Sequence, residues 1–128
     1  MKAEFTKSWK RSVQPRKQRK YKEKASLHTK SRMLRSHLSK ELKEKYSKRS
    51  MRVRTGDKVK IMRGQFAKLE GKVESVNSKK GKIFVAKAEF QKMDGSKAKY
   101  PINPSNVVIL EMNLDDKKRI AKIKKVEK

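Results

Sequence analysis

The chain has 128 residues, among them 39 Lys or Arg and 13 Asp or Glu, which give a formal net charge of +26 at pH 7. Because only 34% of the residues are hydrophobic and 41% are charged, a core that runs through the whole chain is excluded, and part of the chain must be solvated or bound to a partner. A polyanion relieves self-repulsion at this charge, and nucleic acid is a better candidate than an anionic membrane surface.

Residues 1–50 hold 18 basic and 4 acidic residues, and we interpret them as a basic extension. The stretch MKAEFTKSWKRS lacks the apolar segment of a secretory signal, so we expect an intracellular protein. The stretch SVQPRKQRKYKEK has no apolar face and is predicted to be disordered without a partner. From Leu27 to Leu42, apolar residues recur at intervals that allow two short helices, with Ser39 as an N-cap.

Basic and aromatic side chains are interleaved in this extension, a combination that favours RNA binding because cations meet phosphates and aromatic rings stack on bases. The candidate contacts are Trp9, Arg11, Arg16, Lys17, Arg19, Lys20, Tyr21, Arg32, Arg35 and Arg49, and the basic run continues into the next segment with Arg52 and Arg54. Two simpler interpretations stay open, a flexible basic tail with incidental aromatic residues and a solvated linker at residues 49–54.

The apolar alternation of a sheet is concentrated in residues 51–112. Residues 57–62 and 71–77 alternate as strands, and the spacing of Val73 and Val76 indicates a β-bulge in the second. The longest apolar run in the segment, VVIL, is strand-sized and too short to span a bilayer, so we expect no membrane insertion.

Three further strands follow in the same segment. A run over residues 83–90 and the stretch KAKYPI flank Asp94 and Gly95, which are a strong hairpin signal, and SNVVIL gives the last strand. Pro101 and Pro104 are expected at an edge or a kink. Five short strands joined by tight turns predict a mainly β fold, either a small barrel or a curled sheet closed on itself.

The loop between the first two strands is basic and is bounded by glycines. Gly64 is expected to have a positive φ, and Gly71 to permit a close approach as the second strand begins. Cations at a loop can hold phosphate oxygens, while Phe66 either stacks on a base or plugs the end of the barrel. The candidate RNA contacts here are Arg63, Gln65, Phe66, Lys68 and Lys72. The simpler interpretation is a hairpin with solvated lysines and a core Phe.

Two further features lie toward the C-terminus. Ser105 and Asn106, in NPSN, are candidates either for contacting RNA or for holding a turn. Residues 113–128 are predicted to form a short helix whose positive end carries Asp115 and Asp116 and which docks through Ile120 and Ile123.

Nothing in the sequence favours catalysis or a cofactor. His28 and His37 have no acidic or cysteine partner at metal-ligand spacing, so a surface or RNA-facing position is expected. Helix capping accounts for the Asp115–Asp116 pair, and Asp57, which follows Gly56 in a turn, is expected to cap that turn. Phosphate-binding and nucleophile motifs are absent. We expect a protein that is not an enzyme and needs no cofactor.

The stretch TGDKVKIMRGQFAKLEGKVESV is similar to the KOW motif, in which a strand, a basic glycine loop and a second strand open an SH3-like barrel. With the stretches PRKQRK, SHLSKELKEKYSKRSMRVR and DGSKAKYPINPSNVVI, the chain resembles the archaeal and eukaryotic branch of the large-subunit ribosomal protein L-twenty-four family, whose eukaryotic members are called L-twenty-six. That family usually has Lys-Gly where this chain has Ala67 and Lys68, often an acidic residue at Gln65, and a histidine at Asn103.

The resemblance implies a five-stranded SH3-like barrel over residues 51–112, between the basic extension of residues 1–50 and the helical tail of residues 113–128. It also implies a structural protein of the cytoplasmic large ribosomal subunit that binds ribosomal RNA near its 5′ region early in assembly. Its place would be near the mouth of the exit tunnel, beside neighbouring ribosomal proteins and nascent-chain factors. Two alternatives are a KOW-type transcription elongation factor, which predicts a companion domain and less charge, and a non-specific DNA-compacting protein.

Overall fold

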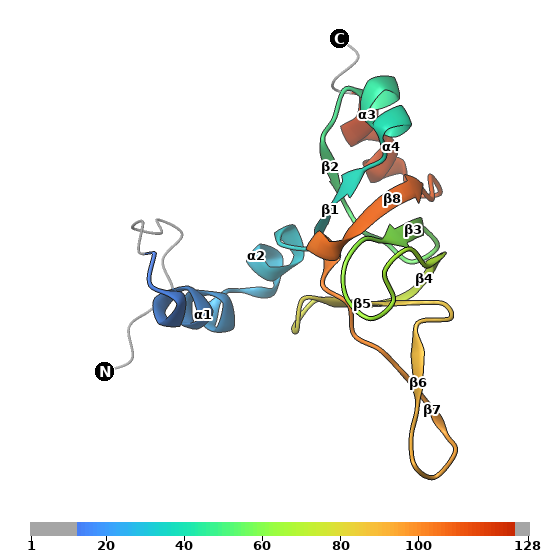
Figure 1. The fold of residues 1–128 in the computed structure, drawn as a ribbon. Coiled ribbons are helices and arrows are strands. Elements are labelled where there is room, and N and C mark those ends of the chain that lie inside the picture. The colour runs from blue at the N-terminus through green and yellow to red at the C-terminus, as the bar shows by residue number, and fades with distance from the viewer. Residues whose placement is uncertain (1–12, 125–128) are drawn as a thin grey trace.

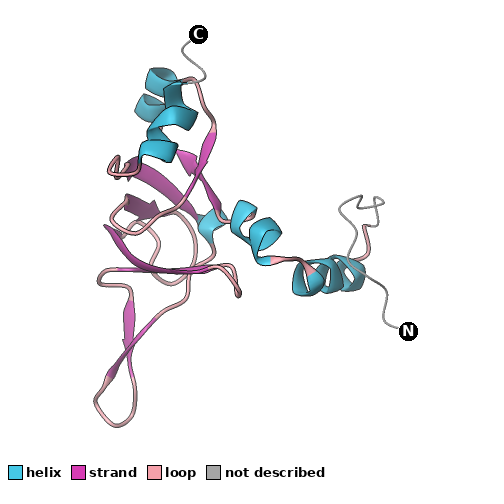
Figure 2. Cartoon of the chain, turned by 180° about the vertical axis from the view of Figure 1, so that it is seen from behind, coloured by secondary structure: helices cyan, strands magenta, loops and turns pink. Residues whose placement is uncertain are grey.

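The computed structural model describes residues 13–124, which form a mixed arrangement of helices and strands (Figure 1). The helices are α1 (Pro15–Lys24), α2 (Leu27–Arg32), α3 (Lys40–Tyr46) and α4 (Lys117–Lys124), with a short 3-10 helix, η1 (Pro104–Asn106). The strands are β1 (Arg35–Leu38), β2 (Ser50–Arg52), β3 (Lys58–Ile61), β4 (Glu70–Asn77), β5 (Lys82–Val85), β6 (Glu89–Gln91), β7 (Lys97–Lys99) and β8 (Val107–Glu111). Figure 2 shows from behind that α1 and α2 extend sideways from the sheet, while the β6–β7 hairpin projects from one end.

Six strands form one sheet in the order β2-β1-β8-β3-β4-β5, and β6 pairs only with β7. The pair β1–β8 is parallel, with His37 opposite Val108, and the other pairs are antiparallel. The expected bulge in β4 is confirmed by a register shift between Val73 and Ser75. The chain is rich in strands, as predicted, but this sheet is not a closed barrel, and the five-stranded SH3-like barrel is not confirmed.

A turn at Lys87 explains why the chain leaves the sheet where a continuous strand was predicted over residues 83–90. Lys87 has a φ of +71°, and the Ala88 amide donates to the carbonyl of Val85 at 3.2 Å, which closes a tight turn. The chain is thereby divided into β5 and β6, and β6 enters the hairpin with β7. The hairpin itself is confirmed, and Gly95 in its turn has a φ of +89°.

Strand β1 lies where the sequence predicted a helix, and β2 lies at residues 49–54, for which a solvated linker was the alternative interpretation. Leu34 and Leu38 were assigned to helices, but the Val53 amide donates to the Leu34 carbonyl at 2.9 Å, and Leu38 belongs to β1. Both leucines are fully buried. The prediction was wrong here because intervals of four residues on a short amphipathic segment also suit alternate positions of a strand. Pairing with the neighbouring strand β8 favours a strand over a helix for this segment.

The predicted short helices are otherwise found. They are α2 and α3, and Ser39 caps α3 by accepting a hydrogen bond from the Leu42 amide at 3.4 Å. The expectation of disorder in residues 12–24 is wrong for Pro15–Lys24, which form α1. Proline suits the first turn of a helix, and Arg, Lys, Gln and Glu are good helix formers, so this segment needs no apolar face to be helical. None of its residues is buried.

The core lies on one side of the sheet and extends to α4. Its fully buried members include Val59, Ile61, Ile83, Val85 and Ile109, which alternate along β3, β5 and β8. As predicted, α4 docks through Ile123, which is buried, and Ile120 is half-buried. None of the helices within residues 13–124 is both long enough and apolar enough to span a bilayer.

Candidate nucleic-acid interface

A pocket of about 250 Å³ opens between the loop that follows β3 and the segment that precedes η1. Three of the predicted contacts, Arg63, Gln65 and Phe66, line it from the loop, and Asn106 lines it from η1. The fold therefore brings together two groups of candidate residues that are about forty positions apart in the chain. We call this hollow the loop pocket.

Backbone geometry fixes the shape of the loop. Gly64 has a φ of +97°, as predicted, and Lys68 has a φ of +73°. The Lys68 amide donates to the Ile61 carbonyl at 2.7 Å, which returns the chain to the start of β4. Gly71 is placed as expected, because a Cβ there would lie 2.8 Å from the carbonyl oxygen of Ala86. The loop thus presents Arg63, Gln65 and Lys68 to solvent from a constrained backbone.

Phe66 packs against another aromatic ring in the loop pocket. Its ring centroid lies 5.1 Å from that of Tyr100, at an interplanar angle of 61°, and Tyr100 in turn meets Phe90 at 6.4 Å. Phe66 is half-buried beside the core. This contact favours a packing role for Phe66, at the end of an open sheet and not of the barrel that was predicted, and the half-buried Phe66 also lines the loop pocket.

The turn at residues 103–106 is held by hydrogen bonds. The Asn103 side-chain oxygen accepts from the Ser105 amide at 3.3 Å, and the Asn106 carbonyl accepts from the Met62 amide at 2.8 Å. The second bond ties this turn to the base of the basic loop. Ser105 is exposed, so holding the turn and contacting RNA are compatible roles.

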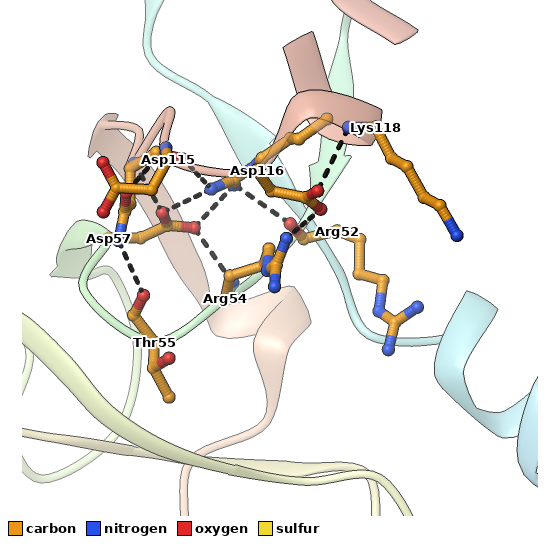
Figure 3. Close-up of polar contacts among 9 residues, drawn as sticks. Arg52, Arg54, Thr55, Asp57, Asp115, Asp116 and Lys118 are labelled. Carbon is orange, nitrogen blue, oxygen red and sulfur yellow. Dashed lines mark hydrogen bonds and ion pairs between the residues drawn. The ribbon is translucent and has the colours of Figure 1, made fainter. Parts of the chain in front are cut away.

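Arg52 and Arg54 lie away from the loop pocket, at a second surface site where β2 approaches α4 (Figure 3). Arg54 is ion-paired with Asp116, and Arg52 is exposed. Asp116 also accepts a hydrogen bond from the Lys118 amide at 3.1 Å, which confirms its predicted capping position at the start of α4. That hydrogen bond, with a smaller contribution from Arg54, holds the pKa of Asp116 below its usual value.

A buried ion pair, which was not predicted from the sequence, lies beneath this second surface site. The Arg119 Nη1 and Nη2 atoms donate to the two carboxylate oxygens of Asp57, each at 2.7 Å, and both side chains are buried. Asp57 caps its turn, as expected, by accepting from the Arg54 amide at 3.0 Å, and it also accepts from the Asn113 amide at 2.9 Å. Asp57 therefore joins the start of β3 to α4.

The other candidate residues are spread over the surface and are not gathered at the loop pocket. Trp9 and Arg11 lie outside the described residues. Exposed candidates elsewhere are Arg16, Lys17, Arg19 and Lys20 on α1, Arg32 on α2, Arg35 on β1, Arg49 before β2, and Lys72 on β4, while Tyr21 is half-buried. Their contact with RNA stays a prediction.

Among the polar and aromatic residues that line the loop pocket, Lys82, Tyr100 and Asn103 were not predicted as contacts from the sequence. Tyr100 was read only as part of a strand, and Asn103 only as a departure from the family pattern. A basic and an aromatic residue next to predicted turns were the available signals. Because these residues are far from the loop in the sequence, their position beside it in the fold could not be predicted.

Within residues 13–124, no three His, Asp or Glu side chains are grouped so that they could hold a metal ion. His28 and His37 are both exposed, as expected.

Comparisons with known proteins agree with the resemblance seen in the sequence. The family model that describes the eukaryotic ribosomal proteins L-twenty-six and the archaeal ribosomal proteins L-twenty-four matches residues 12–126. The large ribosomal subunit protein uL24 of Methanosphaera stadtmanae is 50% identical over 108 residues, which are 84% of this chain and 92% of the relative. The protein of the same name from Methanocorpusculum labreanum is 43% identical over 112 residues, which are 88% of this chain and 93% of the relative.

Proposed function

This chain belongs to the uL24 family of large-subunit ribosomal proteins, a structural family and not one of enzymes, and on that premise we propose that it binds ribosomal RNA through the loop pocket and the basic surface around it. The single observation that carries the proposal is the loop pocket itself. It combines a guanidinium, an ammonium, side-chain amides and two aromatic rings in one hollow.

Each of these groups has a counterpart in a nucleotide. Arg63 and Lys82 are placed to neutralise phosphate oxygens, and counterions released from the RNA supply the free energy. The rings of Phe66 and Tyr100 offer an apolar surface to an unstacked base, and the amide groups of Gln65 and Asn103 offer donors and acceptors to its edge. A constrained loop that presents these groups can select RNA by shape as well as by charge.

The finer parts of the proposal follow from the family resemblance. They are binding near the 5′ region of the large-subunit RNA early in assembly, a final position near the exit tunnel, contacts with neighbouring ribosomal proteins and nascent-chain factors, and a cytoplasmic ribosome as the location. The net charge of +26 supports a polyanionic partner that contacts much of the surface of this protein.

The proposal is tested by titrating the full chain against two ligands of equal length at two salt concentrations. One ligand is the 5′ region of large-subunit ribosomal RNA, and the other is duplex DNA. We expect the RNA to bind more tightly and to keep its advantage at the higher salt. Equal binding that is lost in parallel as salt rises would overturn the proposal and favour a charge-driven DNA-compacting protein.

The role of the loop is tested with the double variant Arg63→Ala and Lys68→Ala. We expect weaker RNA binding. We also expect a flatter salt slope, which is the slope of the logarithm of the binding constant against the logarithm of the salt concentration. The slope should change by about 1 to 2 units, since each lost phosphate contact changes it by roughly 0.7–0.9. The control is Lys40→Ala with Lys117→Ala, which removes the same charge from exposed positions on α3 and α4. Equal slopes for the two double variants would remove the loop from the interface.

A further inference from the structure

A second hollow, of about 240 Å³, lies between the helices α1 and α2 and the turn that joins β4 to β5. Five lysines line it, and we call them the lysine cradle: Lys22 on α1, Lys30 on α2, and Lys79, Lys80 and Lys82 at the turn. None of the five was selected from the sequence. They come from segments about fifty residues apart, so only the folded chain brings them together.

The lysine cradle has no counter-charge of its own. Asp and Glu are absent from its lining, and the ion pairs found in the described part of the chain involve other cations. Like charges that converge without a partner repel one another and destabilise the fold. This arrangement is stabilised when an anion with several charges occupies the hollow.

The turn that carries three of these lysines has a defined backbone. The Asn77 side-chain oxygen accepts a hydrogen bond from the Lys80 amide at 3.2 Å, and Gly81 has a φ of +65°. Asn77 and Lys82 are paired across β4 and β5, so the turn begins and ends in the sheet. Its lysine stems therefore start from fixed positions.

The lysine cradle adjoins the loop pocket. Lys82 and Asn103 line both hollows, which makes the two a continuous surface around the end of β5. A strand of nucleic acid whose base enters the loop pocket would continue toward the lysine cradle with its phosphates. Ammonium groups suit such phosphates because they act as point charges and demand no fixed orientation.

We propose that the lysine cradle is a second RNA site, which binds consecutive backbone phosphates of the strand that occupies the loop pocket. This inference rests on the proposed function and adds residues that it does not include. The chemistry of the neighbouring pocket, with rings and amides beside cations, favours a nucleotide chain over an acidic protein segment as the occupant of the lysine cradle.

The test uses the full chain and the 5′ region of large-subunit ribosomal RNA. The double variant Lys79→Ala and Lys80→Ala changes two exposed turn residues. We expect it to flatten the salt slope of RNA binding by about 1 to 2 units, at roughly 0.7–0.9 for each phosphate contact. The control is again Lys40→Ala with Lys117→Ala. Identical slopes for the two double variants would overturn the lysine cradle as a binding site.

A second readout needs no substitution. Lysines are acetylated with acetic anhydride with and without the RNA, and their modification is measured by mass spectrometry. We expect the RNA to protect Lys79, Lys80 and Lys82 while Lys40 and Lys117 keep their reactivity. Protection of Lys68 in the loop without protection of the lysine cradle would overturn the inference and indicate a different occupant, such as an acidic protein surface.

The two failures can be told apart. If the wild-type chain shows no preference for the RNA over duplex DNA, the proposed function fails, and the lysine cradle fails with it. If the wild-type chain prefers the RNA but the lysine-cradle variant behaves as the control does, only the lysine cradle fails.

Discussion

The carboxylate of Asp57 is fully buried, and Arg119 neutralises it with two hydrogen bonds of 2.7 Å. Removing one partner of such a pair leaves a charge in the interior without compensation. We expect Arg119→Ala to lower the free energy of unfolding by about 3–5 kcal/mol in urea denaturation.

The matched control for that experiment is Arg54→Ala, which removes an arginine from the exposed pair with Asp116. Because solvent screens exposed ion pairs, we expect the free energy of unfolding of this variant to be close to that of the wild type. A loss for Arg119→Ala that is no larger than the loss for Arg54→Ala would contradict the role given to the buried pair.

Lys68 adopts a backbone conformation that favours glycine, with a φ of +73°. A residue with a Cβ atom in this conformation destabilises the fold by roughly 1–2 kcal/mol, and glycine removes this strain. Glycine also raises the conformational entropy of the unfolded chain, which offsets part of the stabilisation. We therefore expect Lys68→Gly to raise the free energy of unfolding by about 0.5–1 kcal/mol. Denaturation of Lys68→Ala serves as the control, because alanine keeps the Cβ atom, and equal stabilities of the two variants would argue against backbone strain.

At the scale of single elements, the β6–β7 hairpin depends on its turn. The Ser96 hydroxyl donates to Asp94 Oδ1 at 2.6 Å, and the Ser96 amide donates to the same atom at 2.9 Å. The hydroxyl contact is the larger cause that holds the pKa of Asp94 below its ordinary value of 3.8. Because the folded pKa is the lower one, this stabilisation of the turn is present above pH 3.8 and is lost as the pH falls through the folded pKa.

We expect Ser96→Ala to raise the pKa of Asp94 toward its ordinary value, measured by NMR titration of the carboxyl carbon. Asp116 is an internal control, since its pKa is held down chiefly by the Lys118 amide. An unchanged titration of Asp94 would show that the hydroxyl does not stabilise the ionised turn.

At the scale of the whole molecule, the N-terminal extension has two parts, for which we expect different roles. Helix α1 buries none of its residues, whereas Leu34, just before β1, and Leu38, within β1, are fully buried. We expect deletion of residues 1–24 to leave the melting temperature close to that of the full chain while RNA affinity falls.

Deletion of residues 1–38 is the comparison, because it also removes β1 and both buried leucines. Loss of two such side chains costs roughly 5 kcal/mol or more, a large part of the stability of a small domain. We expect this longer deletion to abolish the cooperative thermal transition. Similar melting curves for the two truncated chains would contradict the division of the extension into an outer RNA-binding part and an inner structural part.

The sequence by itself determined the features that depend on neighbouring residues. The β6–β7 turn at Asp94 and Gly95, the cap at Ser39 and the positive φ of Gly64 were predictable, because turn and cap chemistry acts over two to four positions. The resemblance indicated the family, and the charge of +26 predicts a polyanion as the partner. The basic loop was also identifiable, since its residues are consecutive.

Only the tertiary structure decided how distant segments combine. The pairing of β1 with β8, the Asp57–Arg119 pair and the lysine cradle each join residues more than forty positions apart, and local pattern carries no signal for such contacts. Leu38 fitted a helix and a strand equally well until β8 supplied a hydrogen-bonding edge. The division of the strand predicted over residues 83–90 into β5 and β6 was not predictable either, because it depends on a φ of +71° at Lys87, a backbone conformation that lysine rarely adopts.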